Sequence, residues 1–382
     1  MKILVILERI YPTPGNNALV FSPLLPLLCK EHEVFIFSTE PIKYETDETN
    51  YPTEWCGCKV FYPRLRAGRK GILAKISPSL DESLRTFRSL RKSVRQLDSQ
   101  YHFDGVITTF KHNEQVCAAL KVKTRRKILY IMDPMRVLTE ENYPRRKKAY
   151  WKHVLSAQDT VLTTPFIKDR LERSGLVKKQ SITALAFPKV IDQSFSRKLP
   201  EDGYIRLLFN GWLYSDIRSP KFFLEILSRL DERFIVTFMG RECQKLTEQF
   251  EIQTKAKLVT LPHQPYDVAL QALADADILI NIGNSVPVHL PSKTLEYINT
   301  GKPFVNFYKL DDCPTLYYTS RYPLCLNMSE KQSDLDEAAR QFIQFCVENK
   351  GKTLDRALIE REFADCTPRY IAETILNAFA KK

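Results

Sequence analysis

The chain has 382 residues, of which 44% are hydrophobic and 27% are charged, and this composition excludes a disordered or fibrous protein. Its length predicts two domains of ordinary size. The longest apolar candidate for a membrane span, residues 18–29, is interrupted by Pro23 and Pro26. A spanning helix needs about 20 apolar residues, so we expect none.

Charge is distributed unevenly along the chain. Residues 1–200 carry 35 Lys and Arg against 20 Asp and Glu, whereas residues 201–382 carry 22 against 25. A net charge of +15 on the first half predicts a polyanionic partner for that half. The basic residues form groups at Arg64, Arg66, Arg69, Lys70 and Lys75; at Arg85, Arg88, Arg91, Lys92 and Arg95; at 125–127; and at 145–148.

An anionic membrane surface is the partner we expect, because peripheral enzymes bind lipid headgroups through basic amphipathic surfaces. The second basic group lies in a helical pattern whose other face is apolar at Leu84, Phe87, Leu90, Val94 and Leu97. A solvated helix face that covers a core is the alternative. No nucleic-acid recognition motif accompanies the charge, so we expect no nucleic-acid partner.

The nine cysteines are scattered, and only Cys56 and Cys58 lie close together. Their spacing matches no usual zinc pattern, and an odd number argues against a disulfide framework. The apolar stretch at residues 3–7 is too short for a secretory signal. We therefore expect reduced thiols in a cytoplasmic protein, held peripherally at the inner membrane face by its basic half.

Strands and helices alternate through the first half. Strands are predicted at Lys2–Leu7, Glu33–Ser38, 59–62, Gly105–Thr109, 127–132 and Thr160–Thr163. Helices are predicted at 17–30, 80–98, 113–122 and from Pro165 onward. This alternation indicates parallel strands joined by crossover helices, and ligands of such sheets gather at the carboxyl ends of the strands.

The second half repeats this pattern. Strands are predicted at 205–209, Phe234–Met239, 258–261, 277–283 and 304–307. Helices are predicted after Pro220 and at 267–274, 335–349, 352–364 and 369–380. No D-x-D sequence in the chain looks like a metal-diphosphate bridge. Asp275 and Asp277 flank Ala276 at the start of a strand, and we interpret their carboxylates as surface capping groups.

The most informative stretch is residues 277–305, DILINIGNSVPVHLPSKTLEYINTGKPFV. Ser292 is the predicted N-cap of a short helix, and Gly301 suits the left-handed residue that ends it. A loop that meets a helix N-terminus favours phosphate, because free backbone N–H groups and the helix dipole both point there. Glu296 shares a helix face with Ser292, and its carboxylate is suited to accept hydrogen bonds from sugar hydroxyls.

The sequence LPSKTLEYINTGKPFV resembles the signature segment of family-4 glycosyltransferases of the GT-B fold. The resemblance implies an α/β protein with two Rossmann-like domains facing across a cleft, at residues 1–198 and 199–366, and a C-terminal helix at 367–382 that packs back on the first domain. It implies transfer of a sugar from a nucleotide-diphosphate donor to a saccharide or lipid-linked acceptor. A UDP-sugar is the donor that we expect. Retention of configuration, and no metal or other cofactor, are part of this expectation.

The resemblance also assigns roles to residues. In the family, the loop after the first strand approaches the donor, a basic residue near the helix start contacts the diphosphate, and the glutamate binds the ribose. Backbone groups after a later strand meet the nucleobase. Carried over to this chain, the nucleotide-sugar contacts are Gly15, Asn16, Gly211, Arg218, His263, Leu290, Ser292, Lys293 and Glu296.

The chain departs from the family in the loop after the first strand, where a Gly-Gly pair is usual and Gly15 is followed by Asn16, and at three other positions. The usual arginine after the first glycine of the second domain is replaced by Trp212. A first glutamate, eight positions before the ribose glutamate, is replaced by Val288, with His289 adjacent. A histidine expected after strand 127–132 is absent, and Asp133 follows there. His289 and Asp133 are therefore the candidate catalytic residues, although an Asp-Pro pair also suits a simple turn.

These departures leave two other functions open. A nucleotide-sugar epimerase of the same fold would need paired acid and base residues near the donor. A transferase-like scaffold that binds a partner without catalysis would need neither. The missing GxGxxG pattern after the first strand counts against a dinucleotide cofactor.

Overall fold

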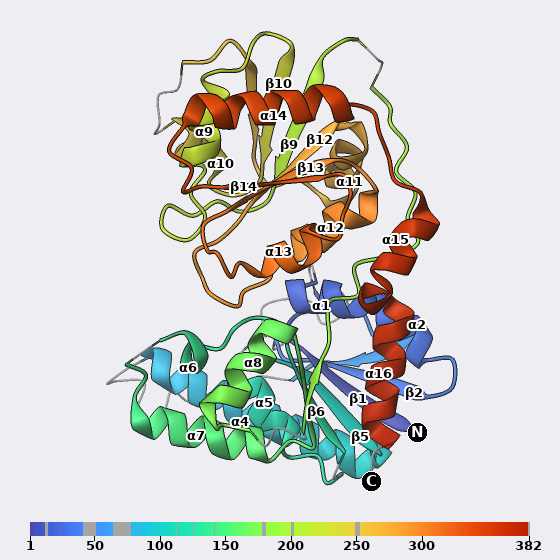
Figure 1. Ribbon diagram of the computed structural model, residues 1–382. Coiled ribbons are helices and arrows are strands. Elements are labelled where there is room, and N and C mark those ends of the chain that lie inside the picture. Colours follow the sequence, from blue (N-terminus) through green and yellow to red (C-terminus); the bar gives the residue numbers. More distant parts are fainter. Residues whose placement is uncertain are drawn as a thin grey trace. The chain divides into compact units, whose positions relative to one another are not determined.

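The computed structural model divides into two compact units, Met1–Pro188 with Asp365–Lys382 (unit 1) and Lys189–Ala364 (unit 2) (Figure 1). It describes residues 1–11, 14–40, 51–63, 78–111, 113–124, 126–140, 142–177, 181–199, 202–248 and 253–380. The boundary precedes the predicted one after residue 198. The reason is that Lys189 pairs with Glu296 and the backbone N–H of Ile191 donates to Asn299 Oδ1, both within unit 2.

Unit 1 is built on a sheet with the strand order β3-β4-β2-β1-β5-β6-β7-β8 in the described residues. All neighbouring pairs are parallel except β3 with β4. The strands are β1 Lys2–Leu7, β2 Glu33–Ser38, β3 Glu54–Trp55, β4 Cys58–Phe61, β5 Gly105–Thr109, β6 Lys127–Ile131, β7 Thr160–Thr163 and β8 Ile182–Ala184.

Helices flank this sheet. They are α1 Asn16–Phe21, the 3₁₀ turn η1 Ser22–Leu24, α2 Leu25–Leu28, α4 Pro78–Tyr101, α5 Asn113–Ala119, α6 Arg136–Thr139, α7 Arg145–Ser156, α8 Pro165–Ser174 and α16 Pro368–Ala380. The predicted helix at 17–30 is three short pieces, because Pro23 and Pro26 each lack the N–H that a continuous helix needs. No helix among the described residues is long and apolar enough to cross a membrane.

The C-terminal helix α16 belongs to unit 1 and packs on η1 and α2. Phe379 lies so close to Gly105 that a Cβ at this glycine would overlap the ring. In a separate cluster of unit 1, Leu90 and Val94 of α4 pack into a core with Phe35 of β2. The predicted apolar stripe of α4 is therefore confirmed for these described positions.

Unit 2 is built on a parallel sheet with the strand order β11-β10-β9-β12-β13-β14. The strands are β9 Ile205–Asn210, β10 Phe234–Met239, β11 Lys257–Leu261, β12 Ile278–Ile282, β13 Phe304–Tyr308 and β14 Cys325–Ser329. The helices are α9 Lys221–Leu227, α10 Cys243–Glu248, α11 Tyr266–Asp275, α12 Ser292–Thr300, α13 Pro314–Thr319, α14 Leu335–Asn349 and α15 Arg356–Glu362, with a 3₁₀ turn η4 Ala364–Cys366.

Aromatic side chains hold the core of unit 2 together. The ring of Phe223 in α9 lies 5.7 Å from Phe238, 5.1 Å from Phe307 and 5.8 Å from Phe342. Phe342 belongs to α14, which crosses the sheet in Figure 1. Such rings bury large apolar areas, and this packing fixes the positions of the strands and of their carboxyl ends.

Candidate functional site

Three adjacent strands of unit 2 each end in a glycine. Gly211 follows β9, Gly240 follows β10 and Gly283 follows β12. A Cβ at Gly240 would overlap the carbonyl oxygen of Gly211, and a Cβ at Gly283 would lie 2.7 Å from the carbonyl oxygen of Phe307. The loops after the central strands are therefore drawn together at the carboxyl edge of the sheet, where ligands of open α/β sheets bind.

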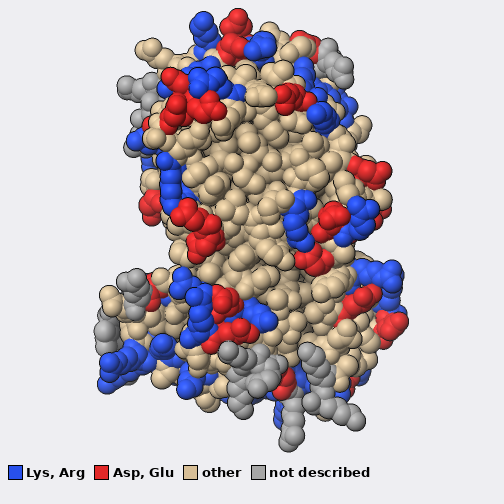
Figure 2. Space-filling view, viewed as in Figure 1, with Lys and Arg blue, Asp and Glu red and all other residues tan. Residues whose placement is uncertain are grey.

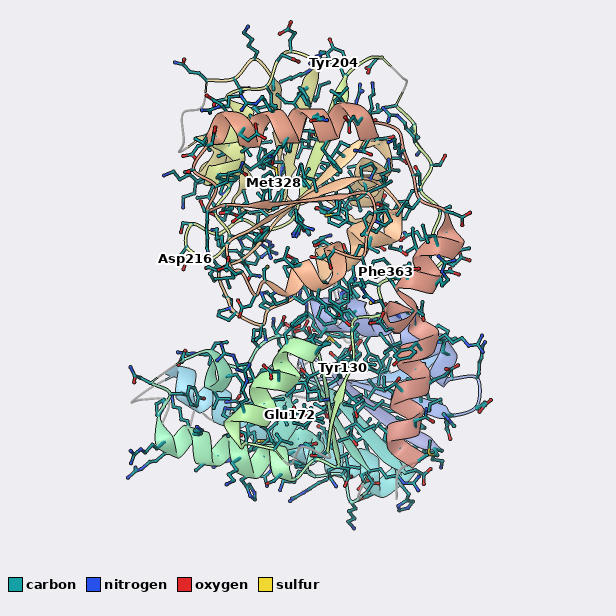
Figure 3. All side chains as sticks on the ribbon, viewed as in Figure 1. Tyr130, Glu172, Tyr204, Asp216, Met328 and Phe363 are labelled. Atoms are coloured by element: carbon teal, nitrogen blue, oxygen red, sulfur yellow. The ribbon has the colours of Figure 1, made fainter. Side chains whose placement is uncertain are left out.

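Arg218 lies beside this edge on a tight hairpin. Tyr214 and Arg218 exchange two backbone hydrogen bonds of 3.1 Å, and Asp216 lies between them at the tip (Figure 3). The Arg218 Nη1 donates to the Trp212 carbonyl at 3.3 Å. The Arg218 Nε is buried and has no hydrogen-bond partner within the described parts of the chain, and burial lowers the pKa of Arg218. A buried unsatisfied donor on a cation is suited to an anionic ligand.

The loop from Gly283 to Pro291 is tied to that hairpin, since the backbone N–H of Ser285 donates to the Ile217 carbonyl at 2.9 Å. Asn284 is 3% exposed. Its Oδ1 accepts from the N–H of Val286 at 3.1 Å, and its Nδ2 lies 2.8 Å from Nδ1 of His289. The bond to Val286 identifies the amide oxygen of Asn284, so the atom that faces His289 is the amide nitrogen, which can only donate. Nδ1 of His289 is therefore the acceptor, and we assign the ring proton to Nε2.

Val288 occupies the position of the first family glutamate and has a left-handed backbone, with φ +60°. A β-branched residue rarely adopts this conformation. Strained residues of this kind cluster at ligand sites. The strain at Val288 therefore indicates that the turn before His289 is held in one specific conformation.

Helix α12 begins differently from the prediction. Pro291 is the N-cap and Ser292 is the first helical residue, so the predicted capping role of Ser292 is wrong. The N-cap residue provides no side-chain hydrogen bond to the helix, so the first N–H groups lack that acceptor. Gly301 ends the helix in the left-handed conformation at φ +74°. An uncapped helix N-terminus is the kind of place where phosphate binds.

Glu296, one turn inside α12, is held between two lysines. Its carboxylate oxygens lie 2.9 Å from Lys189 Nζ and 2.7 Å from Lys293 Nζ, and its side chain is 24% exposed. Burial disfavours the ionised form, but the two lysine charges outweigh that effect and lower the pKa of Glu296 to about 2. The carboxylate thus stays ionised and can accept further hydrogen bonds.

Two other predicted contacts of unit 2, Leu290 and His263, lie outside this group of side chains. Leu290 is 1% exposed, so only its backbone can face a ligand. His263 follows β11 at the edge of the sheet and is exposed. The described residues bring Arg218, His289 and the start of α12 to one edge, whereas the role of His263 stays a prediction.

In unit 1, Gly15 follows β1 and is the N-cap of α1. The carboxylate of Glu8 lies against Gly15, and the backbone N–H of Asn17 donates to Glu8 Oε1 at 3.2 Å. Asn16 is exposed at the start of α1. Because a carboxylate repels phosphate but accepts from hydroxyls, this loop suits sugar hydroxyls. The sequence analysis missed Glu8, although its place directly after a buried strand was a signal.

Asp133 lies just beyond the end of β6 and is half-buried. It belongs to unit 1, whereas His289 belongs to unit 2. The two candidate catalytic residues therefore come from different units.

The sequence analysis also missed a cation at the carboxyl edge of unit 2. Arg241 follows Gly240, and its guanidinium lies 4.9 Å from the ring of Trp212. Trp212 is 40% exposed and stacks on Tyr214 with 4.9 Å between ring centroids. An arginine over an indole is a favourable cation–π pair. A guanidinium thus lies beside the position where the family arginine is missing.

Asp275 and Asp277 lie at the amino end of β12, on the edge opposite Gly283. Asp277 is 2% exposed, pairs with Arg197 and accepts from the N–H of Arg206 at 2.8 Å, so its predicted surface role is wrong. Asp275 accepts from the N–H of Lys198 at 2.6 Å. Among the described residues, no group of three or more His, Cys, Asp or Glu side chains is arranged to hold a metal.

Comparison with solved structures decides the fold. Anabaena HepE in complex with UDP and glucose superposes with a TM-score of 0.68 at 11% identity, covering 100% of this chain and 99% of that one. The chain has the GT-B fold. A glycosyltransferase from Rickettsia africae has a TM-score of 0.66 at 12% identity, covering 99% and 97%.

This GT-B chain is also similar to the apo form of the lipopolysaccharide outer core galactosyltransferase WaaB, with a TM-score of 0.61 at 15% identity and coverage of 100% and 99%. No family model and no curated protein sequence matches it. Likeness at such identities establishes the fold, and it confirms the predicted pair of Rossmann-like domains. What the protein does has to be argued from its own residues.

Proposed function

We propose that this protein is a glycosyltransferase that moves a sugar from a nucleotide-diphosphate donor to a saccharide or lipid-linked acceptor. The observation that carries the proposal is the carboxyl edge of unit 2. There Arg218 with its unsatisfied Nε, the uncapped start of α12 and the ionised Glu296 are gathered beside three strand-ending glycines. A UDP-sugar is the proposed donor, supported by the UDP and glucose in the HepE structure.

Each part of this edge suits a part of such a donor. Arg218 and the first N–H groups of α12, with Lys293, would hold the diphosphate. Glu296 would accept hydrogen bonds from the ribose hydroxyls, and the backbone near His263 would meet the base. Arg241 adds a guanidinium near the place where the chain has Trp212.

The reaction breaks the bond between the sugar and the diphosphate, so negative charge develops on the leaving group. Preorganised cations and a helix dipole stabilise such charge without a metal ion. Asp275 and Asp277 bind Lys198, Arg197 and Arg206 at the opposite edge of the sheet, which supports a metal-independent reaction. Retention of configuration is the outcome we propose from the family resemblance.

His289 and Asp133 are the proposed catalytic residues. With Nδ1 facing Asn284, His289 would donate from Nε2 to a donor-sugar hydroxyl or a phosphate oxygen. Asp133, beyond the end of β6 in unit 1, would accept the proton of the acceptor hydroxyl. An epimerase would need a second acid at the donor, and Glu296, with its pKa near 2, is too weakly basic to shuttle protons at neutral pH.

The test has two stages. A thermal-shift screen of UDP-, GDP-, ADP- and CDP-sugars should single out the donor, because a ligand of the native state raises its melting temperature. Incubation with that donor, labelled in the sugar, and a set of saccharide and lipid-linked acceptors should then give labelled acceptor and free nucleotide diphosphate. An isomerised nucleotide sugar would establish the epimerase instead, and binding without turnover of any acceptor would favour the scaffold.

A further inference from the structure

A groove of about 650 Å³ follows α4 in unit 1, apart from the candidate donor site. It is lined by Arg88, Arg91, Lys92, Arg95, Gln96 and Ser99, with Gln100. The first basic group of the chain, at 64–75, lies outside the described residues. The predicted basic group on α4 thus lines a hollow of the surface.

The four cations of the groove are not paired with an acid among the described residues. In the portion of the chain that is described, Arg88, Lys92 and Arg95 are exposed and none of the four forms an ion pair. Arg91 lies 5.1 Å from the ring of Phe87, and its Nε is buried without a hydrogen-bond partner among those residues. The groove thus holds both open positive charge and an unsatisfied donor.

A fifth cation, Lys121, lies outside α4 but close enough to feel the charges of two groove arginines. Burial and the charges of Arg91 and Arg95 lower the pKa of Lys121. Asp98, an acid of α4 itself, is 5% exposed and accepts from the backbone N–H groups of Phe103 and Lys123 at 3.4 and 2.9 Å. Like charges gathered without a carboxylate repel one another, so the arrangement is favourable when an anion is bound.

We propose that the α4 groove binds the phosphate groups of anionic phospholipid headgroups. Guanidinium groups match phosphate oxygens with paired hydrogen bonds. From Arg88 to Arg95 the helix rises by about 10 Å, which is room for more than one phosphate. The end of α4 leads to the amino end of β5, away from the carboxyl edge where Gly15 and Asp133 lie, so the groove is separate from the acceptor side of the site.

A second cationic surface on the same unit favours a membrane over a small free anion. Helix α7 begins with Arg145, Arg146, Lys147 and Lys148, all exposed (Figure 2, lower left). Cations at a helix N-terminus oppose the helix dipole, so this run is unfavourable for the isolated helix. Tyr150 of α7 is 40% exposed and contacts Cys117 of α5 at 2.8 Å, and an exposed aromatic beside lysines suits a lipid–water interface. Helix α5 in turn packs on α4.

The experiment compares binding of the full chain to vesicles of phosphatidylglycerol and of phosphatidylcholine by sedimentation. The variant R88Q/R91Q/K92Q/R95Q should bind phosphatidylglycerol vesicles about 30-fold more weakly or worse, as expected if at least two of the four cations engage. Binding of the wild type should fall steeply with salt. The matched control is K221Q/K245Q/K331Q/R340Q, which removes the same charge from exposed, ion-paired positions of unit 2 and should bind like the wild type.

A second variant, R88K/R91K/R95K, keeps the charge but loses the paired hydrogen bonds. It should bind more tightly than the glutamine variant and more weakly than the wild type, and it covers the case that the glutamine variant fails to fold. The proposal is overturned if the lysine variant or the control loses as much binding as the glutamine variant, or if the glutamine variant folds and binds normally. It is also overturned if equimolar pyrophosphate abolishes vesicle binding, or if duplex DNA binds the groove while vesicles do not. Donor binding in unit 2 should be unchanged in every variant, so this result is independent of the proposed function.

Discussion

Replacing Glu296 by glutamine keeps the shape of the side chain and removes its charge, and it tests the donor site most directly. If the carboxylate accepts hydrogen bonds from the ribose hydroxyls, charge-assisted bonds of about 1.5–3 kcal/mol each are weakened. UDP affinity, measured by calorimetry, should then fall about tenfold to several hundredfold. Glu296→Ala should give a loss at least as large.

Glu296→Gln should also lower the free energy of unfolding, by an amount that follows from the pKa of Glu296. The pKa of Glu296 falls from 4.5 to about 2, and each unit corresponds to about 1.4 kcal/mol, so the ion pairs contribute roughly 3 kcal/mol at neutral pH. Because the folded-state pKa is the lower one, this stability is present above pH 4.5 and is lost as the pH falls toward 2. The melting temperatures of wild type and Glu296→Gln should therefore differ at pH 7 and converge at acid pH.

Glu337 provides the matched control. It is a glutamate of α14 in the same unit, 41% exposed and paired with Arg340, and such exposed pairs contribute little to stability. Glu337→Gln should leave UDP affinity unchanged and stability nearly so. If Glu296→Gln is folded at the assay temperature and binds UDP as tightly as the wild type, Glu296 holds only Lys189 and Lys293, and the donor-site reasoning fails.

Three further predictions concern the carboxyl edge of unit 2. Activity should persist in excess EDTA, because cations and a helix dipole take the place of a metal; complete loss, restored by magnesium or manganese, would contradict this. Arg218→Gln should weaken UDP binding by calorimetry at least tenfold, because a charged hydrogen bond to phosphate is removed, whereas Arg218→Lys should recover part of it; equal affinities in all three proteins would contradict a diphosphate role. Gly240→Ala should lower the free energy of unfolding by about 2 kcal/mol or more, since its φ of +139° and the adjacent Gly211 carbonyl leave no room for a Cβ; an unchanged denaturation midpoint would show that the two loops are not in contact.

Much of the secondary structure could be predicted from the sequence. The bounds of Lys2–Leu7, Glu33–Ser38 and Gly105–Thr109 agree with the prediction, because strands of a parallel sheet are buried on both faces and read as continuous apolar runs. Helix α7 was missed, because its first turn is a run of charge with no apolar periodicity to indicate a helix. The start of α12 was displaced by one residue, since a proline and a serine can both occupy the N-cap and propensity does not choose between them.

The motif around Glu296 was visible in the sequence, because a helix N-terminus, a left-handed glycine and a carboxylate one turn apart are local features. The second cation that holds that carboxylate was not visible, because Lys189 lies in a distant segment and no local pattern pairs it with Glu296. The same is true of Arg241, which reaches Trp212 only because β9 and β10 are neighbours in the sheet. Spacing along the chain determines which residues share one helix or one strand end, whereas the order of strands in the sheet decides which of those ends meet. Of the two charges that lower the pKa of Glu296, Lys293 lies three residues away on the same helix, whereas Lys189 was brought there by the tertiary structure alone.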